Sequence, residues 1–190
     1  PLYQKAPYVG RALRSVFGQT MDDFEAILID DGSTDDVLRS LAGLSDTRLV
    51  IHRQKHQGVS MARNRGVSLA RAPWVAFLDA DDEWRPTFLE STLRIAVTSP
   101  GLSAVFSNLR DHRSDRPMLA AVSRAGSIVK DYFETLLENE GVGMSSSSVL
   151  VSKAHLLACG GFPDGVEHGE DIDLWARLAW SGDLGFCAET

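Results

Sequence analysis

Hydrophobic residues recur along this chain with two different spacings, and the two spacings alternate from one end to the other. From Ala6 to Gln19, apolar side chains stand at Val9, Leu13 and Val16, which is the one-sided spacing of a helix resting on a sheet. Short continuous apolar runs instead fit buried strands. These criteria predict helices over 6–19, 36–44, 59–70, 86–97, 128–139 and 172–180, and strands over 24–29, 49–52, 74–78, 103–107 and 147–151. Such alternation predicts an α/β fold with parallel strand pairing and right-handed crossovers.

Length and hydrophobic content predict one domain. The 190 residues, 44% of them hydrophobic, suffice for a single core. Segment 109–126 is polar and weakly patterned, and we expect a surface excursion there, with at most a short strand pair. The chain begins at Pro1, where an incoming strand is expected, and stops at Thr190 soon after a helix, so both ends look truncated.

The net charge and the lengths of the apolar runs exclude some classes of function. The net charge of −7, with no basic block, disfavours nucleic acid and anionic membranes as partners and favours small-molecule chemistry. Without an apolar run of membrane-spanning length or a signal-peptide pattern, we expect no membrane span and a cytoplasmic location, either free or peripheral at the inner face of the membrane. Cys159 and Cys187 are expected to be reduced and without a role.

The segment from Trp74 to Asp82 carries the strongest chemical signal, because an uncharged strand ends in Asp79, Asp81 and Asp82. Ligands gather at the carboxyl ends of strands in open α/β sheets. If the backbone stays extended, Asp79 and Asp81 project to one side and Asp82 to the other. Carboxylates of this kind favour Mg²⁺ or Mn²⁺ held together with a substrate diphosphate. The alternative is that residues 79–83 only form a turn and a helix cap.

A second acidic turn, from Asp30 to Asp36, also follows an apolar strand. Asp31 could accept hydrogen bonds from the N–H groups of a nucleobase, and Gly32 permits close approach of the backbone to a ligand. The alternative is that these residues only start the next helix. We expect one residue of 33–35 to cap that helix, which leaves the role of Asp31 open.

Two further clusters lie at predicted helix starts. Gly58 and Ser60 open a helix whose N-terminal N–H groups suit an anion, and Arg63 lies one turn further in, although it equally fits a solvated helix face. Glu170 and Asp171 follow a Gly-Gly-Phe-Pro run at 160–163 and stand at the first turn of the last helix. Acids there can stabilise the helix dipole without any catalysis.

Together and in this order, the clusters resemble those of the family 2 glycosyltransferases, the large inverting group with the GT-A fold. The matching segments are the end of a first strand at 1–3, Asp-Asp-Gly-Ser-Thr-Asp at 30–35, Gly-x-Ser-x-Ala-Arg-Asn-x-Gly at 58–66, Asp-Ala-Asp-Asp at 79–82, and Gly-Gly-Phe at 160–162 with Glu-Asp-x-Asp-Leu-Trp at 170–175. They span essentially the whole chain, and five short motifs in correct order rarely arise by chance.

The resemblance implies a fold and a division of labour. The fold would be a three-layer, Rossmann-like GT-A sandwich with a mostly parallel central sheet. Residues 1–108 would bind the nucleotide sugar and residues 109–190 would face the acceptor. A central strand and part of the base pocket would precede Pro1.

The resemblance also implies residue roles on the donor side. Tyr3 would stack on the nucleobase and Asp31 would hydrogen-bond it, with Pro1 contributing backbone and Arg63 lying near the base or the diphosphate. The remaining positions would contact the ribose, the sugar nucleotide and the metal: Asp79, Ala80 and Asp81 for the donor, and Asp81, Asp79 and Asp82 for Mn²⁺ or Mg²⁺, with Asp81 the first choice.

On the acceptor side, Asp171 would be the general base that removes the proton from the attacking hydroxyl, with Glu170 as the alternate base. His168 and Trp175 could line that side, although a helix-facing Trp is more often core. The expected activity is metal-dependent inverting transfer from a nucleotide-diphosphate sugar, with a UDP-sugar favoured, to a carbohydrate or glycoconjugate acceptor in polysaccharide or glycoconjugate synthesis. The donor sugar, the acceptor and the oligomeric state stay open.

Two other function classes fit parts of the sequence. A haloacid-dehalogenase-type phosphotransferase also uses Asp-x-Asp after a strand, but it would want Thr or Val where Glu83 stands. A silent module would keep the nucleotide pocket without turnover. The presence of both the metal cluster and Asp171 argues against that second alternative.

Overall fold

Two β-sheets organise the part of the chain that the computed structural model describes, which is residues 1–109, 127–129, 132–134, 144–166 and 168–188. The smaller sheet pairs β1 (Ala26–Asp30) and β2 (Leu49–Arg53) in parallel. Leu2 prolongs it with a parallel bridge to Asp30, since Leu2 N donates to Ile29 O at 2.8 Å. The first residues of the chain therefore run alongside β1.

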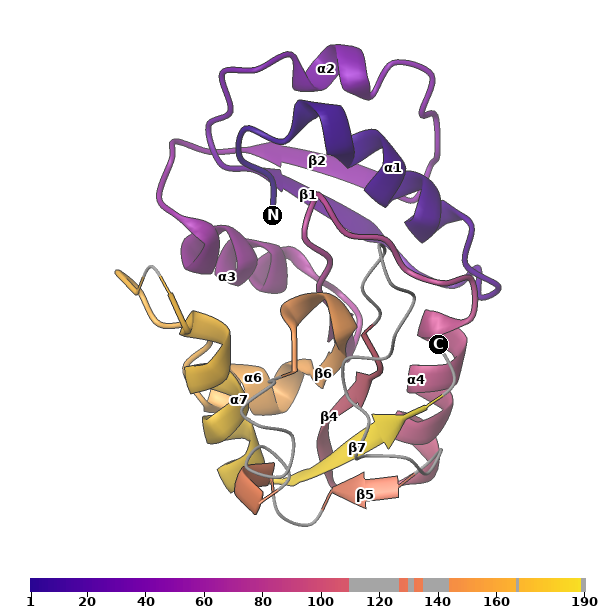
Figure 1. Cartoon of the computed structure of the whole chain (residues 1–190), viewed down its shortest axis with the longest axis vertical. Helices are drawn as coiled ribbons and strands as arrows, with labels where there is room; N and C mark the ends of the chain where they lie inside the picture. Colours follow the sequence, from indigo (N-terminus) through magenta and orange to yellow (C-terminus); the bar gives the residue numbers. More distant parts are fainter. Residues whose placement is uncertain (110–126, 130–131, 135–143, 167, 189–190) are drawn as a thin grey trace.

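Helices cover both faces of the smaller sheet (Figure 1). On one side lie α1 (Ala6–Phe17) and the short α2 (Val37–Ser40), and on the other lies α3 (Val59–Leu69). Apolar side chains of α1, α2 and β1 form one core cluster with Leu2 and Ala80. This cluster is the one that the spacing of apolar residues in the first helix predicts.

The larger sheet has five strands in the order β3-β6-β4-β7-β5. Its strands are β3 (Trp74–Ala76), β4 (Leu102–Ser107), β5 (Ser127–Val129), β6 (Val149–Ser152) and β7 (Asp183–Cys187). Only β4 and β7 pair in parallel, and the other three pairs are antiparallel. The expectation of a mostly parallel central sheet is therefore wrong for this sheet. Its strand β6 enters antiparallel between β3 and β4.

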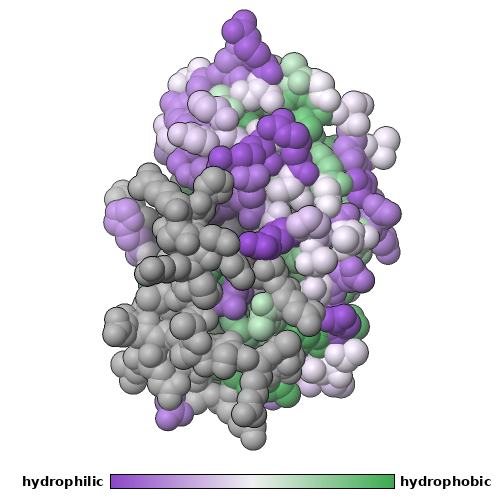
Figure 2. Space-filling model, turned by 45° about the vertical axis from the view of Figure 1, so that its right-hand side comes forward, coloured by the Kyte–Doolittle hydropathy of each residue, from purple (hydrophilic) through white to green (hydrophobic). Residues whose placement is uncertain are grey.

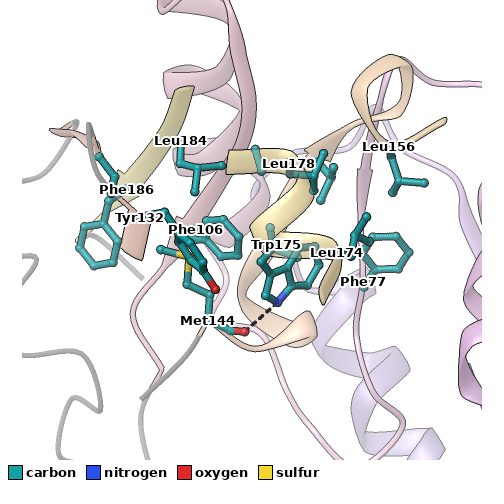
Figure 3. Packing of buried hydrophobic residues seen from close by; sticks show 14 of the residues in the cluster. Phe77, Phe106, Tyr132, Met144, Leu156, Leu174, Trp175, Leu178, Leu184 and Phe186 are labelled. Carbon is teal, nitrogen blue, oxygen red and sulfur yellow. Dashed lines mark hydrogen bonds between the residues drawn. The ribbon is translucent and has the colours of Figure 1, made fainter. Parts of the chain in front are cut away.

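Helices also sandwich the larger sheet, with α4 (Phe88–Thr98) on one face and α6 (Lys153–Ala158) and α7 (Glu170–Ser181) on the other (Figure 1). Side chains alternate accordingly along β4, where Phe106 packs in the cluster of α7 and Val105 in that of α4. Trp175 is completely buried, and its indole N–H donates to Met144 O at 2.9 Å (Figure 3). The interpretation of Trp175 as a core residue is confirmed.

Several predicted elements change in kind or position. The helix predicted over 128–139 is wrong at its start, because 127–129 form β5 and pair with β7, while 132–134 are helical and the rest lies outside the described residues. The strand predicted from 147 begins as a 3₁₀ turn at Ser146–Ser148. Helix α6 and strand β7 were not predicted. The expected excursion over 110–126 lies outside the described residues.

An apolar groove of about 760 Å³ lies between the two sheets, lined by β1 and β3 and by side chains of α1, α3 and α4. Because its walls are mostly carbon, it does not suit an anionic ligand. On the face shown in Figure 2, hydrophilic side chains cover much of the described surface and hydrophobic ones reach it in smaller areas.

Asn64 of α3 makes two hydrogen bonds to the loop before α7. Asn64 Nδ2 donates to Phe162 O at 2.8 Å, and Asn64 Oδ1 accepts from Phe162 N at 2.9 Å. A Cβ added at Gly161 would lie 2.6 Å from Asn64 Oδ1, whereas one at Gly160 would meet nothing within 4 Å. Both glycines have positive φ, 74° and 83°, so both would share the left-handed backbone strain.

We expect Gly161→Ala to lower the free energy of unfolding by about 2 kcal/mol more than Gly160→Ala, because only the former displaces the partly buried hydrogen bonds between Asn64 and Phe162. Urea unfolding followed by tryptophan fluorescence measures both variants. Equal losses would show that backbone strain alone, and not the contact with Asn64, sets the effect.

Candidate active site

The strand β3 ends in a turn that gathers three carboxylates. Asp82 N donates to Asp79 O at 3.0 Å, so the backbone does not stay extended and Asp79, Asp81 and Asp82 share one turn. Asp79 N donates to Ser147 Oγ at 3.1 Å, which fixes the turn to the 3₁₀ segment before β6. The turn interpretation of this cluster is confirmed, but the cap of the following helix is Thr87.

Basic side chains from the first residues and α1 flank this turn. Lys5 Nζ lies 2.6 Å from Asp81 Oδ2, and Arg11 pairs with Glu83 at 2.8 Å. Partial burial and the charges of Asp79 and Asp81 raise the pKa of Asp82, against a hydrogen bond from Ser147 that lowers it. The charged form of Asp82 is therefore disfavoured at this position.

The turn fits a hard divalent cation. Carboxylate oxygens are the ligands that Mg²⁺ and Mn²⁺ prefer, and a nearby cation would stabilise the charged form of Asp82. In the described part of the chain, no three Asp, Glu, His or Cys side chains are grouped so that they could hold a metal unaided. Sites that share the ion with substrate phosphates need only one or two protein carboxylates.

The buried Asp31 carboxylate organises the loop that leads into α3. It accepts hydrogen bonds from Gln54 Nε2 (2.8 Å), His56 Nδ1 (2.8 Å), Gln57 N (3.0 Å) and Gly58 N (2.8 Å). Because an ionised carboxylate only accepts, His56 Nδ1 carries the proton in this contact. Gly58, at φ 93°, is the N-cap of α3, which confirms the predicted helix start.

An aromatic pair stands beside Asp31. The rings of Tyr3 and His56 stack with centroids 3.9 Å apart and an angle of 16° between their planes. Tyr3 is 43% exposed, so one ring face can still meet a planar ligand. Pro1 is half-buried and within electrostatic reach of Asp31 and Asp79. The residues predicted to bind the base thus lie close together. His56, which was not predicted, lies among them.

We expected one of residues 33–35 to cap α2. Their side chains instead accept hydrogen bonds from the first residues of the chain. The cap is Asp36, which accepts from Arg39 N at 3.2 Å. Asp35 instead accepts from Ala6 N at 2.7 Å and so holds the start of α1. The expectation that one residue of 33–35 caps α2 is wrong, because these side chains turn toward the chain start.

Arg63 is buried and joins the two acidic clusters. Its Nη2 lies 2.9 Å from Asp79 Oδ1 and its Nη1 lies 2.7 Å from Glu170 Oε1. The guanidinium also sits over the ring of Phe162, 5.1 Å from its centroid. The solvated-face interpretation of Arg63 is therefore wrong, and residues far apart in sequence meet around one cation.

Asp171 stands next to this network with a less engaged carboxylate. Burial and the neighbouring charge of Glu170 raise its pKa, while a hydrogen bond from Ile172 N and the charge of Arg63 act in the opposite direction. The hydroxyl of Tyr132 is buried and has no hydrogen-bond partner among the described residues. Burial and, to a smaller extent, the charge of Asp171 raise the pKa of Tyr132. A carboxylate with a raised pKa is suited to accept a proton.

Two other residues predicted for the site, Ala80 and His168, lie outside this network of contacts. Ala80 is buried in the cluster with Leu2, so only its backbone can meet a donor. His168 is exposed just before α7. Within the described residues, no helix is both long and apolar enough to cross a membrane.

A family model described as "Glycosyl transferase family 2" matches residues 1–141. The chain belongs to glycosyl transferase family 2. An uncharacterized glycosyltransferase of Rickettsia conorii is 27% identical over 187 residues, which are 97% of this chain and 30% of the relative. The succinoglycan biosynthesis protein ExoW of Rhizobium meliloti is 44% identical over 95 residues, 47% of this chain and 30% of that protein. This chain thus spans about a third or less of these family 2 relatives.

Solved structures show the same fold. TarS 1-349 of S. aureus in complex with UDP-GlcNAc matches with a TM-score of 0.84 at 17% identity, over 100% of this chain and 55% of that one. The mannosyltransferase PcManGT from Pyrobaculum calidifontis, in complex with GDP-Man and Mn²⁺, matches with a TM-score of 0.74 at 19% identity, over 100% and 55%. The GT-A glycosyltransferase fold is thereby confirmed, with a mixed central sheet.

We expect Asp31→Asn to destabilise the domain by about 2 kcal/mol, because an amide NH₂ would then face the backbone donors of residues 57 and 58. Asp36→Asn is the matched control, since Asn caps a helix as well as Asp and this position is exposed. Urea unfolding compares them. Two equally small changes would contradict a structural role for the Asp31 carboxylate.

Proposed function

We propose that this domain transfers a sugar from a nucleotide-diphosphate donor to an acceptor hydroxyl with inversion of configuration. The observation that carries the proposal is the placement of Asp171, with its raised pKa, next to the Glu170–Arg63–Asp79 contact that leads to the carboxylate turn. The residues that we propose for the donor side and for the acceptor side thereby belong to one network of contacts. Family membership supports the reaction class.

For the donor, we propose a UDP-sugar first and a GDP-sugar second. Tyr3 offers an exposed ring face, Asp31 and Pro1 lie beside it, and the turn of Asp79, Ala80 and Asp81 follows. Similar folds bind UDP-GlcNAc in TarS and GDP-Man with Mn²⁺ in the mannosyltransferase. These complexes support a nucleotide sugar as the donor class.

For the metal, Asp81, Asp79 and Asp82 would hold Mn²⁺ or Mg²⁺ together with the donor diphosphate. When bound, the cation would offset the negative charge that develops on the leaving diphosphate. The protein's own part is to present carboxylates at the end of β3 and to keep Lys5 and Arg11 beside them. We infer that these side chains orient the diphosphate for displacement.

For the base, Asp171 would remove the proton from the acceptor hydroxyl as its oxygen attacks the anomeric carbon opposite the departing nucleoside diphosphate. A single displacement requires no covalent intermediate. Glu170 is a weaker choice, since it is buried and its Oε1 already accepts from Arg63 at 2.7 Å. The structure supports Asp171 over Glu170 for this reason.

We propose polysaccharide or glycoconjugate synthesis on the cytoplasmic side as the setting, because the relative ExoW is a succinoglycan biosynthesis protein. A non-catalytic nucleotide-sugar-binding module is the alternative that the same donor residues would allow. The phosphotransfer alternative receives no support from the family membership.

Calorimetric titration with UDP and with GDP, each with and without Mn²⁺, tests the donor side. We expect metal-dependent binding of UDP, which Asp81→Asn weakens by more than about 10-fold, because a carboxylate that holds the ion is lost. The exposed Asp36→Asn is the control and should bind like the parent. Metal-independent binding, or equal binding by Asp81→Asn, would refute the metal assignment.

Transfer assays with the donor so identified test the base. We expect Asp171→Asn to leave nucleotide affinity within about threefold and to lower kcat by about 10²- to 10⁴-fold, because only proton removal is lost. Parent-like turnover by Asp171→Asn would remove the base assignment. Nucleotide binding without transfer to any acceptor would favour the silent module.

The pH dependence of kcat/KM gives an independent check. Asp171 acts only when ionised, and its raised pKa moves the loss of activity on acidification to a higher pH than an ordinary aspartate would give. We therefore expect the acid limb of the profile above the usual aspartate range. A limb within or below that range would contradict Asp171 as the base.

A further inference from the structure

Two consecutive residues of α3 hold the segment that delivers the base. Asn64 makes both backbone hydrogen bonds to Phe162, and Arg63 contacts the Phe162 ring and the Glu170 carboxylate. Residues 161–170 belong to the C-terminal part of the chain, whereas α3 packs on β1 of the smaller sheet. The start of α7 is thus anchored to the donor side through these two side chains.

The geometry of Arg63 makes it a rigid spacer between two carboxylates. A guanidinium is planar and presents its donors in a fixed fork, so its two Nη atoms fix the separation of the groups they bind. Here one Nη meets Asp79 and the other meets Glu170. A side chain with a single ammonium cannot set that separation.

Glu170 and Asp171 are the first two residues of α7, and both have helical backbone in its first turn. Fixing the side chain of the first therefore limits where the second can point. The Glu170 side chain is itself 11% exposed, so it cannot move to solvent without opening the site. Movement of Glu170 would carry Asp171 with it.

We propose that Arg63 is a positioning residue for the transfer reaction: it ties Glu170 to Asp79 and thereby sets the place of Asp171 relative to the donor. The inference rests on the proposed function, because it assigns Asp171 as the base. It differs from the place near the base or diphosphate that the family resemblance implies, since both Nη groups of the buried guanidinium face protein carboxylates.

Arg63→Lys keeps the positive charge and loses the fork. We expect kcat to fall by about 10- to 100-fold, because a displacement of the base by about 1 Å costs that much, while the KM for the donor changes by less than about threefold. Glu170→Gln keeps size and shape and should give the same division between kcat and KM. It also preserves a folded protein if Arg63→Lys is unstable.

The double variant Arg63→Lys/Glu170→Gln separates one shared role from two independent ones. If Arg63 acts through Glu170, the double variant should be within about threefold of the slower single variant. Independent roles would multiply the two losses. Arg71→Lys is the control, since Arg71 contacts Glu25 through its Nε and its backbone N–H away from the site, and this variant should leave kcat unchanged.

The pH profile supplies a readout that packing alone would not move. The charge of Glu170 raises the pKa of Asp171, so Glu170→Gln should shift the acid limb of kcat/KM to lower pH while the limb persists. Tyr132 and Arg63 also face Asp171 and are unchanged in this variant. Loss of the limb would instead identify Glu170 as the base.

The outcomes distinguish this inference from the proposed function. Multiplied losses, a change in KM alone, or parent-like kcat in both single variants would overturn the positioning role and leave the proposed transfer intact. Absence of transfer by the parent protein with either nucleotide sugar would overturn both. Coupled losses with a shifted limb are the result that we expect.

Discussion

A guanidinium remains charged at any pH a protein meets, so burying one commits its surroundings to neutralise it. The Arg63 side chain is 3% exposed and finds its two carboxylates on segments that are distant in sequence, the turn after β3 and the start of α7. Neither segment can move away without leaving a buried charge unpaired. This pairing therefore helps to fix the turn after β3 relative to the start of α7, together with apolar contacts such as that of Val67 of α3 in the core cluster of the larger sheet.

The carboxylates of the acidic turn after β1 are likewise bound to other parts of the protein. Its carboxylates are largely used to hold backbone N–H groups, since Asp30 accepts from Ser33, Asp31 from the loop into α3, and Asp35 from the start of α1. Within the candidate site, Asp81 and Asp82 are exposed, Asp171 is half-buried, and the outer face of the Tyr3 ring is accessible. Carboxylates that bind backbone N–H groups thus hold the loops from which a few more accessible carboxylates project, which is the arrangement that preorganisation requires.

The sequence predicted those features that depend on residues near one another in the chain, and missed those that depend on contacts between distant residues. The first helix, the first two strands and α3 were predicted within about two residues, because amphipathic spacing and glycine at a helix start act over one or two turns. The antiparallel entry of β6 and the short β5 and β7 depend on pairing with distant strands. The burial of Arg63 was missed for the same reason, since Glu170 lies on the other half of the chain and no local pattern marks the contact.

The pair of Lys5 with Asp81 has a further consequence for the energetics of ligand binding. Both side chains are more than 40% exposed, so the contact is weak and is screened by salt. A divalent ion that binds at Asp81, as proposed, would displace the Lys5 ammonium from the carboxylate. The measured binding free energy would then be the difference between the free energies with which the ion and the ammonium bind Asp81. Added salt weakens the contact between Lys5 and Asp81 as well as the contact between the divalent ion and Asp81. Ionic strength therefore changes the apparent affinity less than the charge of the carboxylate turn alone would suggest.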